Sequence, residues 1–204
     1  MELIYFADPM CSWCYGFSPE LTKIAAHYRD VPLQIVMGGL RPHGTEIIAD
    51  MKDFLREHWD HVAERSGQPF TYKILEDTTL TYDTEPSCRA VVVVRHMDPT
   101  KEFHFLKSVQ YAFYRDNKNT NEVQTFLEIV DEIALDKNTF LDLFSSDAFK
   151  AKTMRDFQFS AQLGVRGYPT LLMKNDEGYH TLSMGYQTSE KILRRIENIL
   201  TEND

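Results

Sequence analysis

The chain has 204 residues, of which 43% are hydrophobic and 26% charged, and its formal net charge is −9. This length and composition suit a protein with a sizeable buried core, and three cysteines are too few for a disulfide scaffold. The acidic balance argues against binding to nucleic acid and to anionic membrane surfaces, because both depend on lysine and arginine. The N-terminus lacks signal-peptide features, and no apolar run approaches the roughly 18 residues of a membrane span. We therefore expect a cytoplasmic protein.

The N-terminal residues predict a strand, a helix and a second strand. Residues 3–7 form a short apolar run, which Asp8-Pro9 ends. Apolar residues then recur at helical spacing from Ser12 to Tyr28. Residues 33–37 form the next strand candidate, closed by Gly38-Gly39. A second strand that is reached through a helix favours a parallel crossover.

The middle of the chain is predicted to be helical. The apolar residues of the first segment, residues 46–66, are expected on one inward face: Ile47, Ile48, Met51, Phe54, Leu55 and Val62. Residues 88–97 contain four consecutive valines, which would suit a strand, but Pro86 favours a helix start. Residues 102–115 and 122–133 are the remaining helices of this block.

The last third predicts a helix over residues 148–163, a strand over 170–173, a turn at 175–178, a strand over 179–184 and a final helix after Thr188. The order is βαβ, a helical block, then αββα. This indicates an α/β fold, with one small sheet interrupted by a helical insertion. The predicted boundaries are residues 1–42 and 146–204 for the two halves of the sheet domain and 43–145 for the insertion.

Cys11-Ser12-Trp13-Cys14 is the motif that predicts chemistry, because it lies where a strand gives way to a helix. The unpaired N–H groups and the dipole at a helix N-terminus favour a thiolate, which is the nucleophile in disulfide exchange. We expect Cys11 to be the reactive thiol and Cys14, one turn inside, to be shielded.

Two other readings of the motif are weaker. Zinc would need two further ligands, and no second CxxC is present. His58 and His61 are expected on the solvated face of their helix, so no metal is predicted. Inert buried cysteines are the second alternative, because free cysteine is often part of a core.

Several segments together resemble the DsbA-like group of thioredoxin-fold proteins, in particular its cytoplasmic FrnE-like branch with predicted disulfide isomerases. These segments are residues 8–16, 38–42, 84–89 and Gly167-Tyr168-Pro169-Thr170. The resemblance implies a thioredoxin fold interrupted after its second strand, and a cis-proline at Pro169 facing the CxxC. It also implies that Tyr168 offers its backbone to an extended substrate strand. Trp13 is expected at the lip of this site or packed on the insertion.

The expected activity is dithiol–disulfide exchange with protein, peptide or small thiol substrates, glutathione among them, and with no cofactor beyond the cysteine pair. The oxidising periplasmic members carry a histidine inside the motif, where this chain has Ser12-Trp13, so a less oxidising couple is expected. The alternatives are a glutathione-dependent isomerase and a non-enzymatic protein adaptor, since both occur on related folds.

Two further residues near the motif are left with open roles. Asp8 is either a turn residue or a base for Cys14. Cys88 is either a structural core residue or an auxiliary thiol that faces the CxxC from the start of a helix.

Overall fold

The computed structural model describes residues 1–201, which form an α/β fold around one four-stranded sheet. The strands lie in the order β2-β1-β3-β4: β1 (Glu2–Ala7), β2 (Leu33–Met37), β3 (Thr170–Asn175) and β4 (Gly178–Met184). The pair β1–β2 is parallel, whereas β3 is antiparallel to both β1 and β4. The expected crossover and the expected hairpin are therefore both present.

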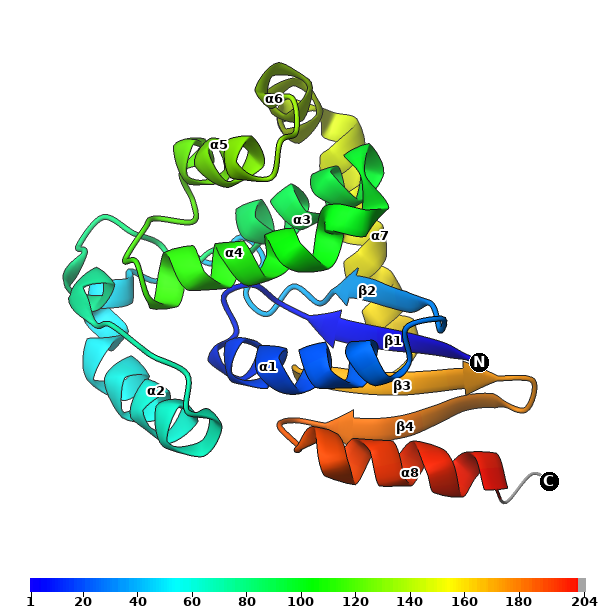
Figure 1. Ribbon diagram of the computed structural model, residues 1–204. Helices are drawn as coiled ribbons and strands as arrows, with labels where there is room; N and C mark the ends of the chain where they lie inside the picture. The colour runs from blue at the N-terminus through cyan, green and yellow to red at the C-terminus, as the bar shows by residue number, and fades with distance from the viewer. Residues whose placement is uncertain (202–204) are drawn as a thin grey trace.

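Helices cover both faces of the sheet (Figure 1). On one face lie α1 (Ser12–His27) and α8 (Ser189–Thr201), and on the other lies α7 (Asp147–Gln162). The alternation of side chains along β1 produces this arrangement, because successive residues of a strand point to opposite faces. Tyr5 belongs to the large core cluster on the α1 side, whereas Ile4 and its neighbours pack against the end of α7.

A block of helices separates β2 from α7 in the sequence and stacks beyond one edge and end of the sheet (Figure 1). It contains α2 (Lys52–Ser66), α3 (Glu85–Met97), α4 (Glu102–Tyr114), α5 (Val123–Glu132) and α6 (Lys137–Ser145). Helix α6 was not predicted from the sequence; its N-terminus is capped by the Asp136 carboxylate, which accepts from Thr139 N at 2.7 Å. Within residues 1–201, no helix combines the length and apolar character that crossing a bilayer requires.

The helix predicted over residues 46–66 is wrong at its start. Residues 46–48 are held by another segment instead, since Ile47 pairs with Thr81 and Ile48 N donates to Leu80 O at 2.9 Å. Backbone groups engaged in this way cannot make helical bonds, so only a 3₁₀ turn at Ile48–Met51 precedes α2. Phe54, expected to face inward, is 63% exposed.

The edge strand β2 is joined to the insertion by charged side chains. Arg95 on α3 donates from Nη2 to Ile35 O and to the Asp156 carboxylate, each at 2.8 Å. Asp156 on α7 in turn accepts from Met37 N at 2.9 Å. These bonds satisfy backbone groups that an uncovered edge strand would leave unpaired, and they fix the insertion to the sheet that carries the cysteine motif.

Candidate active site

The two motif cysteines differ in exposure as their positions in the helix predict. Cys11 is the N-cap of α1, with extended backbone angles, and Cys14 lies one turn inside the helix. Cys11 is 6% exposed and Cys14 is 0% exposed. Of the two, only Cys11 keeps some exposure and lines a surface hollow, which supports its assignment as the reactive thiol.

The loop before β3 lies directly against Cys11. The Tyr168–Pro169 peptide bond is cis, as the resemblance implied. The Cys11 thiol donates to the Tyr168 carbonyl at 3.4 Å, so residues 157 apart in sequence meet at the reactive sulfur. The Tyr168 ring is fixed as well, because its hydroxyl donates to Gly38 O at 2.6 Å and contacts Ser160 Oγ at 3.2 Å.

Gly38 allows this approach because it has no side chain. A Cβ at Gly38 would lie 2.1 Å from two ring carbons of Tyr168, far inside van der Waals contact. The Gly38-Gly39 doublet thus does more than end β2: it leaves space for the ring that positions the Tyr168 carbonyl beside Cys11.

Burial keeps Cys14 in the thiol form. It raises the pKa of Cys14 well above the usual value, and the adjacent Cys11 sulfur raises it further. A hydrogen bond from the Asp8 backbone offsets part of this effect. A shielded, protonated Cys14 suits a resolving thiol, which reacts only after Cys11 has formed a mixed disulfide.

Asp8 lies behind the motif and joins it to Cys88. Its carboxylate accepts from Met10 N at 2.8 Å, which makes it a turn residue, and from Leu40 N at 2.7 Å. The Cys88 thiol donates to the same carboxylate at 3.4 Å. Cys88 is completely buried in the core cluster that contains Cys11 and Cys14. Cys88 is thus a core residue that also faces the motif through Asp8. Its role as an auxiliary thiol stays a prediction.

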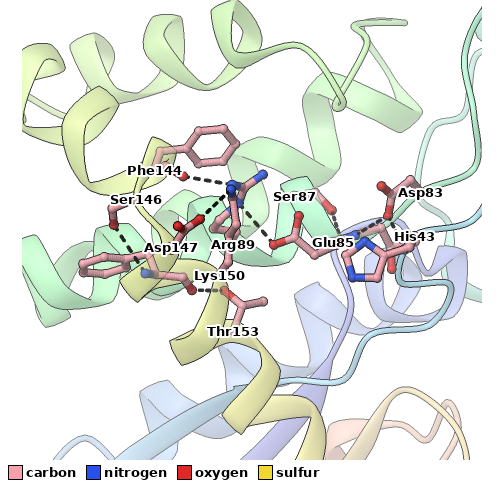
Figure 2. Close-up of polar contacts among 12 residues, drawn as sticks. His43, Asp83, Glu85, Ser87, Arg89, Phe144, Ser146, Asp147, Lys150 and Thr153 are labelled. Carbon is pink, nitrogen blue, oxygen red and sulfur yellow. Dashed lines mark hydrogen bonds and ion pairs between the residues drawn. The ribbon is translucent and has the colours of Figure 1, made fainter.

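The first turn of α3, which carries Cys88, is held by a set of polar contacts (Figure 2). Asp83 accepts from His43 N at 2.7 Å and from Glu85 N at 2.9 Å. Glu85 pairs with Arg89 at 3.1 Å, and Arg89 also donates to Phe144 O at 3.0 Å. These contacts fix the start of the helix between the loop after β2 and the end of α6, and so fix Cys88 against Asp8.

We expect the Asp8→Asn variant to remove a pH dependence of stability. Burial raises the pKa of Asp8 despite its hydrogen bonds. A raised native pKa favours the protonated form, so its contribution is fully present below the unfolded pKa of about 3.9 and is lost as pH rises through the native pKa. Each unit of that rise corresponds to about 1.4 kcal/mol. Urea unfolding of both proteins from acid to neutral pH should show wild type losing stability relative to the variant, and a constant difference would contradict this.

A hollow of about 300 Å³ opens over Cys11. Its walls include Trp13, Leu40, Phe54, His58 and Tyr82. The expectation that His58 lies on a solvated helix face is wrong, because α2 turns this side toward the motif and the imidazole is half-buried against Trp13, with ring centroids 6.0 Å apart. Burial lowers the pKa of His58. The insertion thus places a histidine in the same hollow as Cys11, although none lies within the motif.

A larger hollow of about 610 Å³ adjoins the first, and Trp13 and Tyr168 line both. Its other walls are His61, Glu64 and Arg65 from α2, and Gly185 and Tyr186 after β4. The Arg65 guanidinium lies 5.6 Å from the centre of the Tyr186 ring. Trp13 lines the mouth of the site, where its ring packs on His58 of the insertion and on Tyr186. The two expectations for Trp13 therefore describe one position.

A CxxC at the N-terminus of α1, opposite a cis-proline at the start of a central strand, defines a thiol protein of the thioredoxin-fold class. The comparison with family models gives the family: residues 2–197 match the DSBA-like thioredoxin domain, and the chain belongs to this family.

Solved structures and curated relatives agree with this assignment. A candidate protein disulfide isomerase from Nitrosomonas europaea is 31% identical, with a TM-score of 0.91 and coverage of 99% of this chain and 98% of that one. The cytosolic disulfide reductase DsbM from Pseudomonas aeruginosa is 25% identical, with a TM-score of 0.82 and coverage of 98% and 99%. The ClpXP adapter protein SpxH from Bacillus subtilis is 26% identical over 95% of this chain, which spans 66% of that relative, less than two thirds of its length.

Proposed function

We propose that this protein is a dithiol–disulfide oxidoreductase in which Cys11 is the nucleophile and Cys14 resolves the mixed disulfide. The observation that carries the proposal is the Cys11 sulfur at a helix N-terminus, 3.4 Å from the carbonyl that precedes Pro169. Insulin reduction by the wild-type chain and by a Cys11 variant tests it.

The reaction uses only the cysteine pair. The Cys11 thiolate attacks one sulfur of a substrate disulfide, and one half of the substrate leaves as a thiolate and takes up a proton. Cys14 loses its proton and attacks the Cys11 sulfur, which releases the second half. Two electrons have then passed from the dithiol to the substrate, and the Cys11–Cys14 disulfide remains. The reverse sequence oxidises a substrate dithiol.

We propose protein, peptide and small thiols, including glutathione, as substrates, bound by Trp13, Tyr168 and Pro169. The Tyr168 carbonyl, which lies against the Cys11 thiol, would pair with an extended substrate backbone. The larger hollow would accept the part of the substrate beside its reacting sulfur. A second structure of the Pseudomonas reductase, described with GSH, is 24% identical and shows the fold alone. We place the activity in the cytoplasm, as for that reductase.

We expect Arg65→Gln to weaken binding of glutathione disulfide. Arg65 makes no ion pair among residues 1–201 and lines the larger hollow, so it is free to pair with a glutathione carboxylate. Since exposed ion pairs contribute up to about 1 kcal/mol, KM should rise about threefold to fivefold with kcat unchanged. Hydroxyethyl disulfide has no charge, so its KM should stay the same.

Arg56→Gln is the matched control for this change. Arg56 lies on the same helix and stacks on Tyr72 at 4.7 Å, but it lines neither hollow. Its loss should change neither KM. Equal increases in KM for the charged and the neutral disulfide in Arg65→Gln would contradict the pairing with a carboxylate.

A non-enzymatic adaptor is the second candidate function, favoured by the 26% identity to SpxH. It differs from the first in one respect that can be tested, because an adaptor binds its partner through a surface and needs neither thiol. The glutathione-dependent isomerase has less support, since this chain keeps both cysteines and the related isomerase structure, at 14% identity, shows the fold alone.

A further inference from the structure

A buried hydroxyl without a partner lies beneath the cysteine motif. Tyr5 on β1 is 1% exposed, and within residues 1–201 its hydroxyl oxygen makes no hydrogen bond. Buried polar groups almost always have a partner, because an unpaired one loses its bonds to water without replacement. An orphaned hydroxyl in the centre of a well-packed core therefore needs an explanation.

The Tyr5 ring packs in the same core cluster as Cys14. The ring contacts Phe17 on α1, with centroids 5.8 Å apart. Phe17 follows Cys14 by three residues, so the two side chains are neighbours on one helix face, and both are completely buried. Phe17 also belongs to this core cluster. After burial itself, the Cys14 sulfur is the largest influence that raises the pKa of Tyr5, ahead of Cys11.

We propose that the Tyr5 hydroxyl donates a hydrogen bond to the thiolate of Cys14, a role that rests on the exchange reaction proposed above. A thiol sulfur is a weak acceptor, whereas a thiolate is a charged and much stronger one. The hydroxyl therefore gains its partner only when Cys14 ionises. A hydrogen bond that exists only with the Cys14 thiolate stabilises that form alone, and so accelerates the exchange step in which Cys14 is a thiolate.

The hydrogen bond acts in both directions of exchange. In resolution, the Cys14 thiolate attacks the Cys11 sulfur, the new Cys11–Cys14 bond forms as the bond from Cys11 to substrate breaks, and the substrate leaves as a thiolate. In the reverse direction a substrate thiolate attacks Cys11, and Cys14 is the leaving thiolate. Burial and both sulfurs hold the pKa of Tyr5 well above its usual value, so the phenol keeps its proton throughout.

Tyr5→Phe tests the inference with the chromogenic disulfide dithiobis-nitrobenzoate. The first nitrobenzoate thiolate is released when Cys11 attacks, and the second when Cys14 resolves the mixed disulfide. In the variant we expect the pH profile of the second release to move up by about one unit. At neutral pH the variant then has about tenfold less Cys14 thiolate, but that thiolate is more nucleophilic because its pKa is higher. The rate of the second release should therefore be about threefold lower than in wild type.

Tyr15→Phe is the control for removal of a buried tyrosine hydroxyl. Tyr15 is also completely buried, but its hydroxyl donates to Pro69 O at 2.8 Å. This variant should lose unfolding stability and keep the wild-type pH profile. Tyr5→Phe should keep or gain unfolding stability, because it loses a hydroxyl that has no partner. Its pH profile, in contrast, should shift.

The two proposals fail in different ways in this experiment. Suppose that Tyr5→Phe releases the first nitrobenzoate thiolate normally and releases the second with the wild-type pH profile. This result overturns the role of Tyr5 and leaves the proposed function intact. A wild-type chain whose first release does not depend on Cys11 overturns the proposed function, and the role of Tyr5 with it.

Discussion

The Cys11→Ser variant is expected to reduce insulin no faster than the chemical reductant alone, a loss of about a thousandfold or more. A serine hydroxyl does not ionise near neutral pH, so the nucleophile is gone. Cys14 cannot replace it, because its sulfur is fully buried and its pKa is raised. Serine is a preferred helix N-cap, so the fold should keep its stability or gain slightly. Insulin turbidity measures the activity and thermal unfolding measures the fold.

The outcome also separates the two candidate functions. Activity that persists in Cys11→Ser would move the nucleophile to another thiol and contradict our assignment. A protein without both motif cysteines, Cys11→Ala with Cys14→Ala, should have no exchange activity. If that double variant still delivered a defined client protein to a protease as well as wild type does, the adaptor function would be favoured.

The Gly38→Ala variant is expected to lose about 1–3 kcal/mol of unfolding free energy, and its exchange rate should fall about tenfold or more. The added methyl group would lie 2.1 Å from the Tyr168 ring, so the ring must move and its hydrogen bond to Gly38 O is disturbed. Because the Tyr168 carbonyl contacts the Cys11 thiol, this movement also displaces the loop that lies against Cys11. Chemical denaturation and insulin reduction measure the two effects.

Gly167→Ala is the matched control, since a Cβ at Gly167 has no neighbour within 4 Å although it adjoins Tyr168. Its stability and activity should stay close to wild type. A double-mutant cycle provides a second check, because Gly38→Ala should cost much less stability once Tyr168→Ala has removed the ring. Additive losses would show that Gly38 acts through some other contact.

Much of the fold could be predicted from local sequence patterns. The expected strand over residues 33–37 matches β2, and the first helix agrees with α1 to within one residue. Side-chain periodicity and the Gly and Pro residues at the ends determine such elements within a few residues of chain. The cis bond before Pro169 and the placement of Cys11 at a helix start followed in the same way from short motifs and the family resemblance.

Local patterns were less informative where a distant segment binds the backbone of a predicted helix, or where distant segments decide which side of a helix is buried. The start of the 46–66 segment has a helical pattern, but its backbone bonds to residues 80–82 instead. His58 has the sequence context of a solvated helix residue, yet α2 packs so that it lines the same hollow as Cys11. The spacing of His58 and His61 did show that both lie on one side of α2, although not which surface that side meets.

The sequence by itself determined the order of the strands and of the helices other than α6, and the position of the CxxC motif at a helix start, because each depends on residues that are close together in the chain. Only the tertiary structure decided what surrounds the two sulfurs. The Tyr168 carbonyl, the space above Gly38, the buried Tyr5 hydroxyl and Arg65 in the adjoining hollow come from four separate segments. Their positions follow from the packing of the insertion and of β3 against the sheet, which is a sum of many long-range contacts that no single local pattern encodes.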